Sequence, residues 1–291
     1  GIKKSGAGRL VLSATNDFFK EVSVEGGRNV LADAGAVNGA SQVKLGANDT
    51  LAIEGEGEQR LAMPVAVTSD IDNPAIIDTA ADVTIDQIAV DGALIKRGAG
   101  TLTIDATSGK ASTLSTAYSK EYEASPAAKA LGYFPADGTK PSQNEWCGFS
   151  VAEGTVVIRG DANSPTVSLC NPVIGMNLTN MDVNAQARLV IDGAVVDAST
   201  KHAYLGFGAS YQSDGYKTKQ RTPTLELRNG AFFKGNTMHI GQDTWGGEGC
   251  HPTFALTNST AYFYTLNFTE NQAETRNVVI TAARDSSIMA G

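Results

Sequence analysis

The chain has 291 residues, including 31 Gly and only 9 Pro, and it carries 23 Lys and Arg against 31 Asp and Glu. The formal net charge of −8 argues against a protein that binds nucleic acid, because phosphate binding depends on clustered basic residues. No window holds the roughly 20 apolar residues that a membrane-spanning helix needs. Abundant Gly, Thr, Val, Ala and Asn favour an all-β protein built of short strands and tight turns.

The chain opens on a motif that returns later. Residues 2–14 are Ile-Lys-Lys-Ser-Gly-Ala-Gly-Arg-Leu-Val-Leu-Ser-Ala, and residues 94–106 are Leu-Ile-Lys-Arg-Gly-Ala-Gly-Thr-Leu-Thr-Ile-Asp-Ala. In each copy a lysine and a Gly-Ala-Gly corner precede alternating apolar positions, which predicts a short strand with one buried face. A unit of this size cannot cover that face alone. We therefore expect the copies to be coils of a stacked solenoid.

Short alternating runs follow the first copy. They are separated by Gly, Asn and Asp, which favour turns. They predict strands at 22–24, 30–31, 43–46, 50–53, 64–67 and 83–85.

A longer segment follows the second copy before the strand pattern resumes at 149–158. We interpret 107–146 as an insertion of loop and helix into the solenoid. Residues 125–132, Ser-Pro-Ala-Ala-Lys-Ala-Leu-Gly, begin with an N-cap residue and end with a glycine. This pattern predicts one short helix.

Beyond the insertion the motif changes but the periodicity persists. First strands are predicted at 189–194, 225–231, 254–258 and 278–280, and second strands at 204–208, 239–242 and 266–269. Spacings of roughly 30 residues with variable loops suit a parallel β-helix. We expect residues 1–291 to form one continuous β-helix.

The Lys-x-Gly-Ala-Gly-Thr-Leu-Thr-Ile corner resembles the autotransporter-associated β-strand repeat, which occurs in passenger regions of bacterial type V secreted proteins. The resemblance covers residues 2–33, 93–106 and 149–160. It implies a right-handed, single-stranded parallel β-helix that is secreted or displayed at the bacterial cell surface, in association with the outer membrane. It also implies a role in adhesion or as a spacer. We expect the chain to be a fragment of a longer protein.

Aromatic residues are concentrated in the predicted loops. Rings beside polar groups suit binding to sugar or protein surfaces, because they offer apolar area with little side-chain entropy to lose. We therefore predict ligand-binding residues for glycans or surface proteins at Trp146, Tyr211, Tyr216, Lys217, Lys219, Arg221 and Trp245. The alternative is that these rings cap the apolar ladders or pin their own loops.

Catalytic residues are harder to find. β-Helices also carry polysaccharide lyases and glycoside hydrolases, which need clustered carboxylates. Asp70 and Asp72 form either a solvated acidic turn or a calcium site, and Glu54, Glu56 and Glu58 indicate an exposed loop. We predict no catalytic residue, no metal and no cofactor. The function that we favour is a non-catalytic extracellular scaffold or adhesin-like segment, and the alternative is a carbohydrate-active enzyme on the same fold.

Three histidines and three cysteines complete the candidate groups. His202, His239 and His251 lack metal-ligand spacing, although His202 and His239 each precede a predicted strand and can stack on one side. We expect satisfied or exposed histidines rather than an acid–base or metal pair.

The cysteines are too few and too scattered for a disulfide framework, so we expect buried thiols. A contact or disulfide between Cys147 and Cys170, about one coil apart, is the alternative. The sequence leaves the oligomeric state open.

Overall fold

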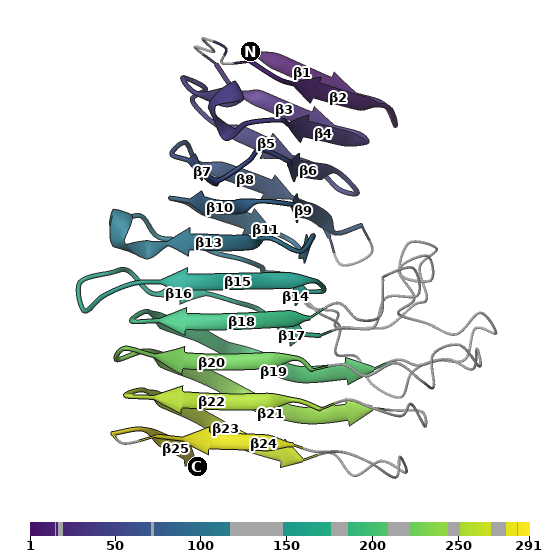
Figure 1. Ribbon diagram of the computed structural model, residues 1–291. Helices are drawn as coiled ribbons and strands as arrows, with labels where there is room; N and C mark the ends of the chain where they lie inside the picture. Colours follow the sequence, from purple (N-terminus) through teal and green to yellow (C-terminus); the bar gives the residue numbers. More distant parts are fainter. Residues whose placement is uncertain are drawn as a thin grey trace, which may run out of the picture.

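The computed structural model describes residues 1–291 except 15, 17–19, 71–72, 117–147, 176–185, 209–221, 244–250, 269–277 and 284. In these described residues almost all regular structure is parallel β-strand, which confirms the all-β prediction. The strands lie in rungs that stack from the N-terminal end to the C-terminal end (Figure 1). No helix within the described ranges is long and apolar enough to cross a membrane.

Three stacks of strands form the faces of the coil in the described part of the chain. The first comprises β1 (Ile2–Ser5), β3 (Val22–Glu25), β5 (Val43–Leu45), β8 (Val65–Thr68) and β11 (Ile88–Asp91). The second comprises β2 (Arg9–Leu12), β4 (Arg28–Leu31), β6 (Thr50–Ile53), β9 (Ala75–Thr79), β12 (Leu94–Arg97), β14 (Phe149–Val151), β17 (Pro172–Ile174), β19 (Val195–Gly208), β21 (Phe232–Asp243), β23 (Thr260–Phe268) and β25 (Ser287–Ala290), with β16 (Val167–Ser168) beside β19. The third comprises β7 (Glu58–Leu61), β10 (Asp82–Ile85), β13 (Thr101–Asp105), β15 (Gly154–Arg159), β18 (Ala187–Asp192), β20 (Thr224–Arg228), β22 (Thr253–Thr257) and β24 (Val279–Ala282).

Each rung places its apolar side chains directly against those of the next rung. In the third stack one register column consists of Leu61, Ile85, Ile104, Ile158, Ile191, Leu227 and Leu256. Every member of this column is at most 1% exposed. Alternation along each strand sends these residues inward, so a one-residue slip would turn the whole column to solvent.

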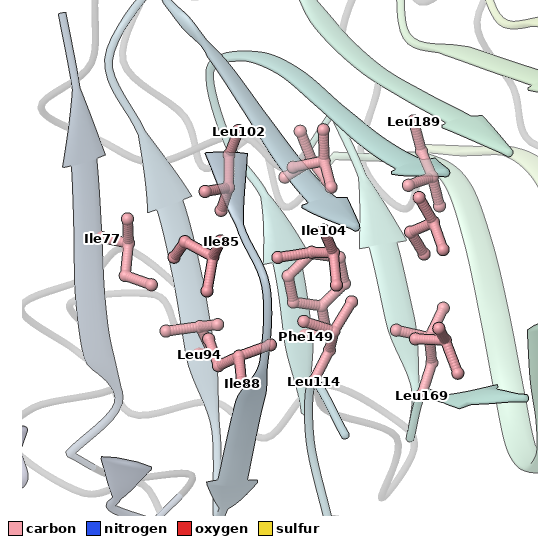
Figure 2. Close-up of a cluster of buried hydrophobic side chains, with 14 of the residues drawn as sticks. Ile77, Ile85, Ile88, Leu94, Leu102, Ile104, Leu114, Phe149, Leu169 and Leu189 are labelled. Carbon is pink, nitrogen blue, oxygen red and sulfur yellow. The ribbon is translucent and has the colours of Figure 1, made fainter. Parts of the chain in front are cut away.

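The ladders merge into one hydrophobic core along the axis of the coil. Figure 2 shows its middle, to which Leu102 and Ile104 from β13, Phe149 from β14 and Leu114 all contribute buried side chains. The predicted inward positions of the second copy are confirmed, since Leu102 and Ile104 are fully buried. In the first copy Leu12 is buried and Leu10 packs against the core from the end of the stack.

The first stack continues beyond β11. Thr113 makes parallel bridges to Ala89 and to Ser168. The next strand on this face is the first half of β19, where Val196 pairs with Val167. The long strands β19, β21 and β23 then each supply the first two faces together.

The predicted helix at 125–132 lies outside the described residues. Within the described start of the predicted insertion, the chain forms a 3₁₀ turn, η2 (Ala106–Ser108), before Thr113 joins the first stack, and Asp105 caps this turn by accepting from the backbone N–H of Thr107. A second such turn, η1 (Ala34–Val37), follows β4. The parallel stacked sheets support the β-helix, whereas its hand of winding stays a prediction.

Asn29 is a polar residue within the apolar ladders. Asn29 is fully buried between its register partners Leu10 and Leu51, and neither Oδ1 nor Nδ2 has a hydrogen-bond partner in the protein. A buried amide without partners costs free energy that a side chain of similar shape avoids.

We predict that Asn29→Leu stabilises the protein by about 1–3 kcal/mol, because it removes the amide and extends the leucine ladder. Thermal and urea unfolding of both proteins measure the change. Asn48→Leu is the matched control: Asn48 has a φ of +61° and donates to Oδ1 of Asn73 at 2.7 Å, so the same substitution should destabilise there. A lower melting temperature for Asn29→Leu would contradict this account.

Candidate functional site

The seven residues that we predicted to bind a ligand all lie outside the described residues. These are Trp146, Tyr211, Tyr216, Lys217, Lys219, Arg221 and Trp245. The same holds for Cys147 and Cys250, so contact between Cys147 and Cys170 stays a prediction. Cys170 itself is buried, and its backbone N–H and carbonyl both bond to the hydroxyl of Ser115 at 2.7 Å.

The repeated lysine forms the most elaborate polar site that the structure describes. Lys96 is the last inward-facing residue of β12, and it is fully buried. Its ammonium donates hydrogen bonds to three backbone carbonyls, those of Gly98 (2.5 Å), Gly100 (2.7 Å) and Glu153 (3.1 Å). The first two belong to its own corner and the third to the next rung, so one side chain joins two rungs.

Lys4 repeats the arrangement in the first copy. Its ammonium donates to the carbonyls of Ser5, Gly6 and Gly26, the last at 2.7 Å. Gly26 and Glu153 each follow by two positions the register partner of the lysine, Val24 or Val151. The motif therefore encodes a contact between successive rungs.

The two copies occupy different corners of the coil. Lys4 lies on β1 in the first stack and its corner leads to β2 in the second. Lys96 lies on β12 in the second stack and its corner leads to β13 in the third. The repeat thus marks a corner rather than one fixed position in the rung, because the need to satisfy corner carbonyls is the same on every face.

Close approach of the rungs explains a glycine of the pattern. Gly154 has a φ of +70°, and a Cβ there would lie 2.3 Å from the carbonyl oxygen of Gly98 and 2.7 Å from that of Gly100. No side chain fits, so only glycine allows the carbonyls of the preceding corner to reach the lysine.

Burial shifts the protonation of Lys96. Removal from water lowers the pKa of Lys96 to about 8, and the attraction of Glu153, Asp78 and Asp82 offsets only part of that effect. Glu153 also accepts from the backbone N–H of Gly98 at 3.1 Å, which closes the corner from the next rung.

Charged side chains join other rungs at the end of the third stack. Asp105 and Arg159 are register partners whose Oδ2 and Nη2 lie 2.7 Å apart, and Asp192 and Arg228 repeat this pair at 2.7 Å. Burial alone would raise the pKa of Asp105, but hydrogen bonds from Arg159 and Thr107 outweigh it and lower that pKa below its usual value. These carboxylates are ion-paired between rungs.

The acidic segments noted in the sequence also make polar contacts. Glu54, Glu56 and Glu58 are exposed, as predicted, and Glu54 in addition pairs with Arg9 at 3.2 Å and with Arg28 at 3.1 Å, which places it in an inter-rung network. Asp70 accepts from the backbone N–H of Asn73 at 2.7 Å, and Asp72 lies outside the described residues. Sequence reasoning missed the network because its members are far apart in the chain.

Two histidines come together on neighbouring rungs. Nδ1 of His202 and Nε2 of His239 lie 2.7 Å apart. The ring of His239 also stacks on Tyr204, its register partner, with ring centroids 4.7 Å apart. His239 is 7% exposed and Tyr204 is 1% exposed. The sequence allowed His202 and His239 to stack on one side, and the structure places their rings in direct contact.

Comparison with known proteins identifies the repeated corner. The passenger-associated-transport-repeat family model matches residues 2–28 and 94–116, the two segments that contain Lys4 and Lys96. The chain thus carries two repeats of this family, which confirms the resemblance to autotransporter passenger repeats and indicates a secreted or surface protein of a bacterium. No curated protein and no solved structure matches the chain significantly.

We predict that Lys96→Met destabilises the protein by about 2–4 kcal/mol, because it leaves buried carbonyls without their donor. Denaturant unfolding measures this loss. Lys3→Met is the control, since Lys3 is 64% exposed and forms only a surface ion pair with Glu25. Equal stability of the two variants would refute the role of the buried ammonium.

The lowered pKa gives a second prediction. The unfolded chain keeps a lysine pKa near 10.5 while the folded value is about 8, so between these values the unfolded state binds more protons and stability rises with pH. The contribution of Lys96 to the free energy of unfolding should increase by about 3 kcal/mol between these two pH values. The difference in unfolding free energy between the wild type and Lys96→Met, measured from about pH 7 to pH 10.5, isolates it. A difference in unfolding free energy that does not change with pH would contradict the lowered pKa of Lys96.

Proposed function

We propose that this chain is a β-helical segment of a passenger region and acts as a non-catalytic scaffold that displays binding loops outside a bacterial cell. The observation that carries the proposal is the match of the passenger-associated-transport repeat to the two corners that join successive rungs. A repeat whose best-defined residues connect rungs serves a long, rigid body. Right-handed winding belongs to the proposal, because parallel strand crossovers are almost always right-handed.

The described charges support a scaffold rather than a catalytic centre. Asp105, Asp192 and Glu54 each contact an arginine from another rung. Burial opposes a lower pKa at both aspartates, but hydrogen bonds from Arg159 and Thr107 lower the pKa of Asp105, and those from Asn229 and Arg228 lower that of Asp192. A general acid for glycoside cleavage needs the opposite, a carboxyl whose pKa is raised. These three carboxylates therefore suit stacking of rungs, whereas burial raises the pKa of Asp49.

Ligand binding in this proposal belongs to the aromatic and basic residues predicted from the sequence. Glycans or surface proteins are the proposed partners, because exposed rings with neighbouring polar groups suit both. Association with the outer membrane and an adhesive role are parts of the same proposal.

A glycan-array screen of the whole chain, run beside a reducing-end assay on the same polysaccharides, tests this function. We expect binding without new reducing ends, weakened at least about tenfold in a Tyr211→Ala/Tyr216→Ala variant and in Trp245→Ala. Tyr264→Ala is the matched control, because Tyr264 is 67% exposed on β23 and outside the predicted set. New reducing ends would contradict the scaffold and show a carbohydrate-active enzyme. Absence of glycan binding would reject glycans as the partner.

A further inference from the structure

The histidine pair lies where two strands are held in an unusual register. β19 and β21 pair in parallel, but their register shifts between Ala198 and His202. Such irregularities re-aim side chains and often lie next to functional sites. Here the shift is followed at once by His202, whose ring reaches the ring of His239 on the next rung although the two residues are not register partners.

The surroundings hold both rings in place. Oδ1 of Asn171, from the preceding rung, accepts from the backbone N–H of His202 at 3.2 Å. Tyr204 stacks on His239 with an interplanar angle of 12°, and His202 and His239 stack on each other with centroids 5.0 Å apart. Since Tyr204 is 1% exposed and His239 is 7% exposed, little water competes for the imidazole of His239.

The facing nitrogens define the chemistry. A contact of 2.7 Å between two imidazole nitrogens requires that one carries a proton and the other offers a lone pair. If the donating ring takes its other neutral tautomer, with the N–H on the far nitrogen, both facing nitrogens present lone pairs to the same point. Two imidazoles converging on one point are ligands for borderline transition metals such as Zn²⁺ and Cu²⁺.

We propose that His202 and His239 form a transition-metal site that links two rungs. The metal ion accepts the lone pairs of Nδ1 of His202 and Nε2 of His239, and the ring that donated the shared proton carries it on its other nitrogen instead, so that both ligands are neutral imidazoles. Metal–nitrogen bonds of about 2.0–2.1 Å require the nitrogens to separate by less than about 1 Å, which small ring rotations achieve. In the described part of the chain no group of three or more His, Cys, Asp or Glu could hold a metal ion, so among these residues the proposed site rests on the two imidazoles.

This site is independent of the scaffold proposal, and it gives the rungs a second type of cross-link. Because the metal binds residues on both β19 and β21 only in the folded state, binding should stabilise the fold by mass action. The stabilisation should grow with metal concentration and should require both histidines.

The test uses the untagged, metal-free chain and its three histidines. Cu²⁺ is added in one equivalent, and electron paramagnetic resonance counts the nitrogens coordinated to it; Zn²⁺ binding is measured by calorimetry and by the shift in melting temperature. We expect two imidazole nitrogens on Cu²⁺. Affinity for Zn²⁺ should fall at least about tenfold in His202→Gln and in His239→Gln, while His251→Ala, the matched control, binds as the wild type does.

Glutamine is used because its amide can keep a hydrogen bond at the same place, so that the variants fold. Circular dichroism confirms the fold of each variant before metal is added. His239→Asn replaces His239→Gln if that variant does not fold. Fewer than two imidazole nitrogens on Cu²⁺, or equal Zn²⁺ affinity in the wild type and the folded variants, would overturn the proposal. A loss of affinity in His251→Ala equal to that in the pair variants would overturn it as well.

Discussion

The fold depends on satisfying the backbone at the corners of the coil, where residues leave the strand ladders. Strand pairing gives each carbonyl a donor along a face, but it cannot do so where the chain turns. At the corner of residues 96–100 the ammonium of Lys96 supplies donors to Gly98, Gly100 and, on the following rung, Glu153. The same side chain thus satisfies the turn and fixes the stacking of the next rung, at the cost of burying a charge.

Much of this fold could be predicted from the sequence. Alternation such as that of Leu102 and Ile104 identifies strands and their buried faces, because a strand has a period of two. The first copy of the motif has the same spacing as the second, yet the copies lie at different corners, since local pattern does not record which face a strand joins. The partners of Lys96 were not predictable either, because Glu153 lies across a long intervening segment.

The polar contacts share one design, in which each joins residues that are distant in sequence and adjacent in the stack. Arg159 meets Asp105, Glu54 meets Arg28, and His239 meets His202. Sequence spacing indicated only that the two histidines can stack on one side, and it found neither ion pair, because loops of variable length separate the rungs and hide the register. The apolar ladders hold the core, while these polar contacts specify which side chains lie side by side along the axis. A body of this kind can carry varied loops without changing its core.

Hydrogen exchange measured by mass spectrometry, on the wild type and on Lys96→Met, tests most directly whether the corner lysine joins rungs. The account predicts that the variant loses amide protection in the peptides that contain residues 94–105 and 149–159, on both sides of the corner, while peptides from β3 and β22 keep theirs. Unchanged protection around the corner, or an equal loss in all rungs, would contradict a local link between two rungs.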